Sequence, residues 1–152
     1  MLDIVHRIGI QAPAAQVYAA LASIDGLAAW WTTRTSGQAQ PGGRIDFKFE
    51  DPAGQEIGGF TMQVLEQTPA QRVRWRVQDG PPEWLDTEVD FELTQDGGWT
   101  IVRFGHRHWR DDGEFRAHCS TKWASFLLSL RDLVETGRGR PAPHDVKIGN
   151  WH

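Results

Sequence analysis

The sequence predicts an α+β domain in which one curved antiparallel sheet of about six strands wraps around a single long helix near the C-terminus. Two observations predict this fold. Segments that alternate apolar and polar residues recur along the chain between short turns, which is typical of an antiparallel meander. One later segment, Phe115–Gly137, instead repeats its apolar residues at helical spacing. Because both apolar surfaces must be buried, we expect the helix to pack on the sheet.

Length and composition indicate one globular domain. The chain has 152 residues, of which 39% are hydrophobic and 24% are charged. Eight Trp and seven Phe, against one Tyr, predict an interior or a pocket dominated by large rings. The net charge of −4 argues against a nucleic-acid partner, which needs a basic surface to bind phosphates.

Cysteine usage and hydropathy favour a cytoplasmic protein without membrane insertion. The single cysteine excludes an internal disulfide. The N-terminal sequence MLDIVHRIGI does not follow the pattern of a signal peptide, and no apolar run is long enough to span a bilayer.

The N-terminal elements are expected to be a strand and two short helices. Leu2–Ile10 alternates as a half-buried strand. Pro13 suits the first turn of the first helix, where its missing N–H is not needed. Ser23 or Asp25 then caps a second helix, which ends at Trp30-Trp31.

A polar loop and five strands are expected to follow. The segment Thr32–Gly43 is rich in turn residues and should be the most mobile part of the chain. The strand candidates, which short turns separate, are Arg44–Glu50, Gly58–Gln67, Arg72–Gln78, Trp84–Thr94 and Thr100–His108. The third and fourth of them carry alternating arginines and alternating acids, respectively. We expect these rows to face each other as a solvated ladder that sets the register, rather than to form an ion-binding site.

The last helix and the tail complete the chain. The apolar residues of the helix fall within about a third of its circumference: Phe115, Cys119, Trp123, Phe126, Leu127, Leu130, Leu133 and Val134. Glycines and prolines after Gly137 prevent the helix from continuing. We expect residues 1–137 to form the domain and residues 138–152 a tail, packed through Val146, Ile148 and Trp151 or else flexible.

Five segments carry a resemblance to a known superfamily: IQAPAAQVYAAL, WWT, PGGRIDFKF, VLEQTPAQRVRW and KWASFLLSLRDLVETGRGRP. Their order resembles the helix-grip fold of the START and birch-pollen-allergen superfamily, also called SRPBCC. Within it, the chain is similar to the group named after the activator of the 90-kDa heat-shock-protein ATPase. That activator resembles this chain only over its C-terminal half, so the resemblance does not imply a chaperone contact. Stand-alone members of the group are mostly treated as small-molecule binders with no shared catalytic motif.

Strand alternation and the resemblance together favour an internal pocket. A sheet that curves around a helix leaves a concavity of the kind that small ligands occupy. The alternative is that the rings fill this space as a solid core. The residues predicted to line the pocket are Trp31, Phe47, Phe49, Met62, Trp75, Thr87, Val89, Phe104, His106, Cys119, Trp123 and Phe126.

Four polar residues are also expected in the interior: His6, Thr87, His106 and Cys119. Buried polar groups need hydrogen-bond partners, so these residues either bond to one another or meet the polar end of a ligand. Either arrangement should bring them close together. The adjacent Trp30 and Trp31 cannot face the same way, so we expect either that one ring anchors the short helices and the other lies at the pocket mouth, or that both rings pack against the core.

Metal and nucleophile sites are the minor alternatives. His106 and His108 form an H-x-H pair, with His118 and Cys119 as further candidate ligands. No carboxylate or second cysteine completes a recognisable set, so we expect no metal. Cys119 near a histidine is a candidate nucleophile, but a lone cysteine on an apolar helix face usually behaves as a small hydrophobe. Short Gly turns do not form a phosphate-binding loop, so no nucleotide cofactor is expected.

The favoured function is the binding of a small hydrophobic or amphipathic ligand, with no catalytic residue. One alternative is a cyclase- or hydrolase-type enzyme, which the superfamily also includes, with His106 as general acid or base. Another is a protein-interaction module, chaperone-linked or not, that uses the outer sheet or the segment Trp30–Gly43. Ala117, Ala124 and Leu128 form a small apolar spot on the outer helix face, so a monomer or weak homodimer is expected.

Overall fold

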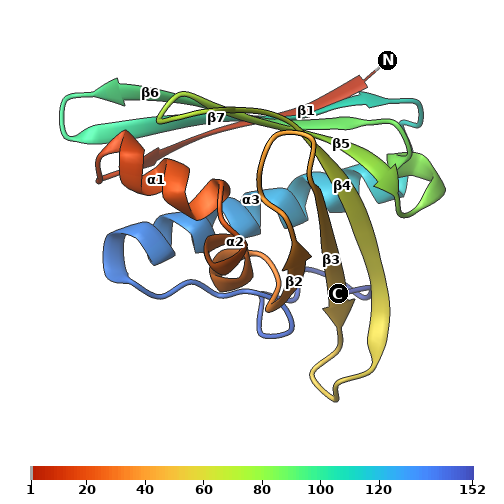
Figure 1. Ribbon diagram of the computed structural model, residues 1–152. Coiled ribbons are helices and arrows are strands. Elements are labelled where there is room, and N and C mark those ends of the chain that lie inside the picture. Colours follow the sequence, from red (N-terminus) through yellow and green to blue (C-terminus); the bar gives the residue numbers. More distant parts are fainter. Residues whose placement is uncertain (1) are drawn as a thin grey trace.

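The computed structural model describes residues 2–152, so Met1 of the predicted domain 1–137 lies outside the described residues. Within this range one antiparallel sheet has the strand order β1-β7-β6-β5-β4-β3-β2. The strands are β1 (Leu2–Ile10), β2 (Arg34–Gly37), β3 (Arg44–Glu50), β4 (Glu56–Thr68), β5 (Arg72–Asp79), β6 (Glu88–Asp96) and β7 (Trp99–Trp109). The α-helices are α1 (Ala14–Leu21), α2 (Ile24–Trp30) and α3 (Glu114–Thr136), and all lie on one side of the sheet (Figure 1). The predicted α+β fold is confirmed.

The two short helices begin where the sequence predicts. The Ser23 hydroxyl accepts a hydrogen bond from the Gly26 backbone N–H at 3.0 Å, so Ser23 is the N-cap of α2 and Asp25 lies in its first turn. Pro13, in an extended conformation, immediately precedes α1. Of these helices, α2 lies beside β2, whereas α1 packs against β5 and β6 (Figure 1).

Two predicted boundaries are wrong. The Thr32–Gly43 segment, expected to be a loop, contains the edge strand β2, which pairs with β3. Its sequence, RTSG, shows no apolar alternation, because an edge strand is held by backbone hydrogen bonds and need not bury side chains. Strand β6 begins at Glu88 rather than Trp84, because Pro82–Trp84 form a 3-10 turn that buries the Trp84 ring.

The β5–β6 register confirms the predicted charge ladder. Arg72, Arg74 and Arg76 lie opposite Glu92, Asp90 and Glu88. The Arg74 guanidinium pairs with Glu88 at 3.2 Å and with Glu66 of β4 at 3.1 Å. These groups remain partly exposed, so the ladder contributes little stability and mainly fixes the strand pairing.

The long helix α3 differs from its predicted range by one residue at each end. Gly137 follows it in the left-handed conformation, with φ of 86°, and its N–H bonds to the Leu133 carbonyl. The buried members of the apolar stripe are Cys119, Trp123, Phe126, Leu127 and Leu130. Over residues 2–152, no helix has both the length and the apolar character needed to cross a membrane.

The C-terminal tail returns to the open end of the sheet, passing α2 and β2 and ending near β3 (Figure 1). Ala142 is buried, and its N–H donates to the Trp31 carbonyl at 2.8 Å, while its carbonyl accepts from the Thr33 N–H at 3.1 Å. Of the three predicted anchors, Val146 and Trp151 are 41% and 48% exposed, and Ile148 is half-buried. The tail is therefore held first by backbone hydrogen bonds at Ala142, which side-chain hydropathy does not reveal.

Candidate ligand pocket

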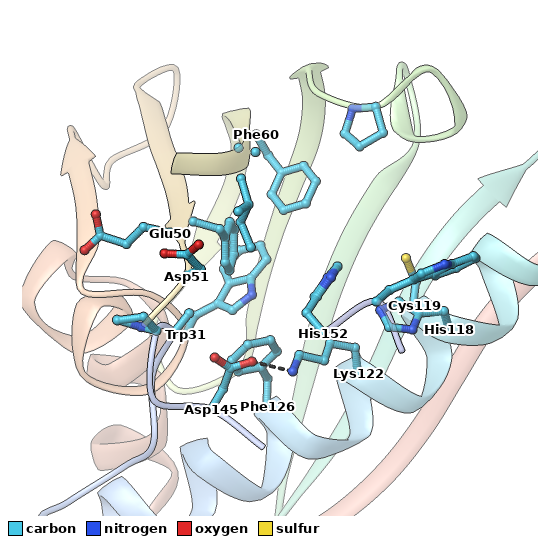
Figure 2. Close-up of a pocket in the computed structure, with 18 of the residues that line it drawn as sticks. Trp31, Glu50, Asp51, Phe60, His118, Cys119, Lys122, Phe126, Asp145 and His152 are labelled. Atoms are coloured by element: carbon cyan, nitrogen blue, oxygen red, sulfur yellow. Dashed lines mark ion pairs between the residues drawn. The ribbon is translucent and has the colours of Figure 1, made fainter. Parts of the chain in front are cut away.

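A cleft of about 570 Å³ lies between the β3–β4 hairpin, α3 and the C-terminal tail. Figure 2 shows Trp31 and Phe60 on one side, Lys122 and Phe126 projecting from α3, and Asp145 of the tail between them. Small-molecule sites usually have volumes of roughly 300–1,000 Å³. The cleft is therefore large enough for a small ligand.

Aromatic rings form most of the apolar wall. The Trp31 ring is 4.9 Å from the Trp123 ring and 6.0 Å from the Phe60 ring, between centroids. Phe60 in turn stacks on Trp84 at 3.9 Å. The Trp30 ring is fully buried and donates its indole N–H to the Ala20 carbonyl at 2.9 Å. Trp30 thus anchors the helices and Trp31 lines the cleft, but the two rings do not face apart, because they stack at 6.0 Å with 12° between their planes.

The predicted pocket residues fall into two groups. Those that line the cleft are Trp31, Phe49, Cys119, Trp123 and Phe126. Those that lie in the packed interior instead are Phe47, Met62, Trp75, Thr87, Val89, Phe104 and His106, each with no exposed surface. Alternation correctly placed these seven on the concave face, but it could not show that neighbouring rings fill the space above them. The interior is thus a solid core that covers β5–β7 and includes Phe47 of β3 and Met62 of β4, with a cleft at the turn end of the β3–β4 hairpin.

His106 closes a hydrogen-bond chain inside the solid core. The Trp123 indole N–H donates to His106 Nδ1 at 3.1 Å, so the ring proton is on Nε2. That Nε2–H donates to the Thr87 hydroxyl at 2.8 Å, and the hydroxyl donates to the Trp84 carbonyl at 2.6 Å. Burial lowers the pKa of His106 from 6.5 to about 3, against a smaller opposing effect of Asp3. The ring is neutral, and both of its nitrogens are occupied.

The other two predicted interior polar residues do not join this chain. His6 Nε2 lies 3.0 Å from the Ser120 carbonyl, between β1 and α3. Cys119 lies in the cleft, where burial raises the pKa of its thiol to about 12, despite a smaller opposing effect of the Trp84 N–H. The expectation that all four residues lie together is wrong. A thiol with so high a pKa is also a poor nucleophile, which argues against the nucleophile alternative.

His106 and His108 do not form a pair of ligands. His108 has a positive φ of 75°, is exposed, and donates its backbone N–H to Asp3 at 3.0 Å. The ring of His106 is instead enclosed by Trp84 and Trp109. In the part of the chain that the structure describes, no group of three His, Cys, Asp or Glu residues could hold a metal ion.

The main charged group in the cleft is Lys122, which sequence reasoning missed. Its side chain is only 10% exposed and forms an ion pair with Asp145 of the tail, drawn as a dashed line in Figure 2. Its ammonium also donates to the Val146 carbonyl at 2.5 Å and lies 5.4 Å from the centre of the Phe126 ring. The available signal was its spacing: residue 122 follows Cys119 by three positions and precedes Phe126 by four, and so shares their helix face.

His118 lies one helical turn before Lys122, at the rim of the cleft. Its ring is 5.1 Å from the Trp151 ring and 4.8 Å from the His152 ring. Burial and, to a smaller extent, the neighbouring His152 and Lys122 lower the pKa of His118, which favours the neutral ring. Its Nε2 is buried and has no hydrogen-bond partner among residues 2–152. This nitrogen is therefore an unsatisfied polar atom beside the tail, which would have to move for a ligand to reach it.

Residues 11–135 match the family described as "Activator of Hsp90 ATPase homolog 1-like protein". The chain belongs to this family. The solution structure of the Aha1 dimer from Colwellia psychrerythraea is 42% identical, with a TM-score of 0.78, and the match covers 91% of this chain and 100% of that chain. The predicted membership of the SRPBCC superfamily is thereby confirmed. The aromatic cleft lies within an Activator of Hsp90 ATPase homolog 1-like domain.

More distant structures share the fold with this family member. SSP2350 from Staphylococcus saprophyticus is 15% identical, with a TM-score of 0.74, and covers 93% of this chain and 98% of its own. CalU16 from Micromonospora echinospora is 18% identical, with a TM-score of 0.69, and covers 89% of this chain and 77% of its own. A search of the curated proteins finds no significant match.

Proposed function

We propose that this protein binds a small hydrophobic or amphipathic ligand in the cleft between the β3–β4 hairpin, α3 and the tail. The observation that carries the proposal is the cleft itself, about 570 Å³ in volume and walled by aromatic rings. An apolar concavity with a few polar groups is the usual form of a small-molecule site.

The wall of the cleft is held from behind by the solid core. Trp31 is 2% exposed and its ring lies 4.3 Å from the buried Phe47 ring. Trp123 is fixed through its hydrogen bond to His106. Such side chains lose little further freedom when a ligand arrives, so more of the contact energy is available for binding.

The proposal is tested with a neutral fluorescent probe, N-phenyl-1-naphthylamine, whose emission rises in apolar surroundings. We expect the full chain to bind it and Cys119→Phe to weaken binding at least tenfold, because the new ring occupies the cleft. Ala117→Phe is the matched control, since residue 117 lies exposed on the outer face of the same helix. Circular dichroism would verify that both variants fold.

Equal probe binding by the Cys119→Phe and Ala117→Phe variants would contradict the proposed site, and no probe binding by the unmodified chain would contradict the function. The enzyme alternative has lost its predicted general acid or base, because His106 does not line the cleft and both its ring nitrogens are engaged. No catalytic step is assigned.

A further inference from the structure

We infer that Lys122 recognises the carboxylate of an amphipathic acid, and that Asp145 of the tail occupies this position when no ligand is bound. The inference rests on the proposed function and narrows it to one ligand class. The ligand would have an apolar body that packs among Trp31, Phe60 and Trp123, with a carboxylate at the Lys122 end of the cleft.

The first argument is the position of Lys122. A buried ammonium requires a paired anion, because its lost hydration must be replaced. Lys122 is 10% exposed, and its ion pair and its hydrogen bond both go to the tail, to Asp145 and to the Val146 carbonyl. Its ammonium lies over the ring of Phe126, an aromatic residue of the cleft wall. The cation thus stands at the junction of the apolar wall and a separate segment of chain.

The second argument is the set of polar groups around Lys122. His118 is four residues earlier on α3, so both side chains project from the same helix face. Its buried Nε2 finds no partner within the described residues 2–152 and can donate to the second oxygen of a carboxylate. Two donors on adjacent turns suit the two oxygens of one carboxylate, and a charge-assisted bond from the ammonium is the stronger of the two.

The third argument is that the acidic groups on the hairpin side are engaged locally. Glu50 pairs with Arg34 at 3.3 Å. Asp51 accepts the backbone N–H groups of Ala53 and Gln55 at 3.0 and 2.9 Å within the turn. These carboxylates stabilise the hairpin, whereas the carboxylate of Asp145 belongs to the tail. A ligand acid can therefore replace Asp145 without disturbing the sheet.

The exchange keeps Lys122 paired. The backbone hydrogen bonds at Ala142 hold the tail to Trp31 and Thr33, on the near side of Asp145. Beyond Asp145, the Trp151 side chain is 48% exposed. A ligand carboxylate would substitute one anion for another at Lys122 and displace only this outer part of the tail. Asp145 is thus an internal competitor, which lowers the apparent affinity for the ligand.

The test compares decanoate with decanol, which have the same chain length, by calorimetric titration of the full-length protein below the micelle concentration of decanoate and the solubility limit of decanol. We expect decanoate to bind at least tenfold more tightly than decanol. Lys122→Met should remove this preference by weakening decanoate alone. Asp145→Asn should tighten decanoate binding about tenfold, because the competing anion is gone. Lys48→Met and Asp112→Asn, both on exposed residues outside the cleft, are the matched controls and should change neither affinity.

The double variant Lys122→Met/Asp145→Asn keeps the inference testable if either single change destabilises the protein, because it removes both charges together. It should bind decanol like the unmodified chain and show no preference for decanoate. Decanoate binding that is unchanged in Lys122→Met, or weakened in Asp145→Asn, would overturn the inference. Decanol binding without any preference for decanoate would overturn it while leaving the proposed function intact, whereas no binding of either compound or of N-phenyl-1-naphthylamine would overturn both.

Discussion

The two ends of the concave face have the same strand alternation but opposite uses of their polar groups. Over β5–β7, the polar members of the interior, Thr87 and His106, bond to each other and to their neighbours within the core. At the β3–β4 end, the ammonium of Lys122 has its ion-pair partner in the tail, and His118 Nε2 has no hydrogen-bond partner in the described chain. The first end is closed by the domain itself, while the second is closed by a terminal segment.

Trp123 marks the boundary between these two ends. Its indole N–H donates into the closed chain at His106, while its ring lies 4.9 Å from Trp31 in the cleft wall. One side chain of α3 therefore belongs to both regions. A structural interior and a binding surface therefore differ more in their polar groups than in their apolar area. Only polar groups that are unsatisfied, or whose partner can be exchanged, can form new hydrogen bonds or ion pairs with a ligand.

The largest expected effect that tests this difference is the pH dependence of stability caused by His106. Its pKa in the folded state, about 3, lies below its ordinary value of 6.5, so the unfolded chain binds a proton that the folded chain does not. Stability is therefore lost as pH falls below 6.5, at about 1.4 kcal/mol per unit, or roughly 2 kcal/mol by pH 5. Urea unfolding at pH 7.5 and pH 5 measures it, and His106→Asn should remove this part of the loss.

The loss of stability at low pH needs a control for other groups. The pKa values of His118, His152 and Glu66 are also lowered in the folded state, so these groups also destabilise the fold as the pH falls. The His118→Asn/His152→Asn variant should retain most of the loss between pH 7.5 and pH 5. If His106→Asn loses as much stability between pH 7.5 and pH 5 as the unmodified chain, His106 is not held neutral in the folded state. The polar groups over β5–β7 would then not be a closed, internally satisfied set.

A smaller effect is expected when one link of the closed chain is removed. Thr87→Val keeps the side-chain shape but deletes the hydroxyl, which leaves the His106 Nε2–H unpaired and removes one of the two hydrogen bonds to the Trp84 carbonyl, the other being from the Thr87 backbone N–H. We expect a loss of about 2 kcal/mol in the free energy of unfolding, since unsatisfied buried groups are costly. Thr94→Val, at an exposed position of strand β6, which directly follows Thr87, is the matched control. Equal losses in the two variants would show that the chain contributes nothing beyond packing.

Much of the fold could be predicted from the sequence because alternation and helical spacing report burial directly. Strands β1 and β3 have the predicted bounds, and α3 follows its apolar stripe. Strand β2 could not be predicted, since an edge strand of sequence RTSG buries no regular face. Trp84 was assigned to a strand, but the strand alternation that points Thr87 and Val89 inward would point Trp84 outward, and it is a 3-10 turn that buries its ring.

The candidate site was harder to predict than the fold. Phe47 and Phe49 lie on the same face of β3, yet Phe47 is fully buried and Phe49 lines the cleft. Whether rings fill a concavity depends on three-dimensional packing, which a period of two residues does not encode. Lys122 was missed for a similar reason: its partner Asp145 lies in the tail, and no spacing rule connects a helix residue with a distant tail carboxylate.

The smallest expected effect concerns the tail end of the cleft. Trp151→Ala should change the free energy of unfolding by no more than about 0.5 kcal/mol, because the side chain is 48% exposed and lies on a terminal segment. It should nevertheless raise the pKa of His118, since burial is the main cause of the lowered value and the Trp151 ring lies 5.1 Å away. An NMR titration of the His118 ring measures this, with Trp99→Ala, at a similarly exposed ring on β7, as control. A loss of several kcal/mol with no change at His118 would make the tail a part of the structural core, and the two ends of the concave face would then be closed in the same way.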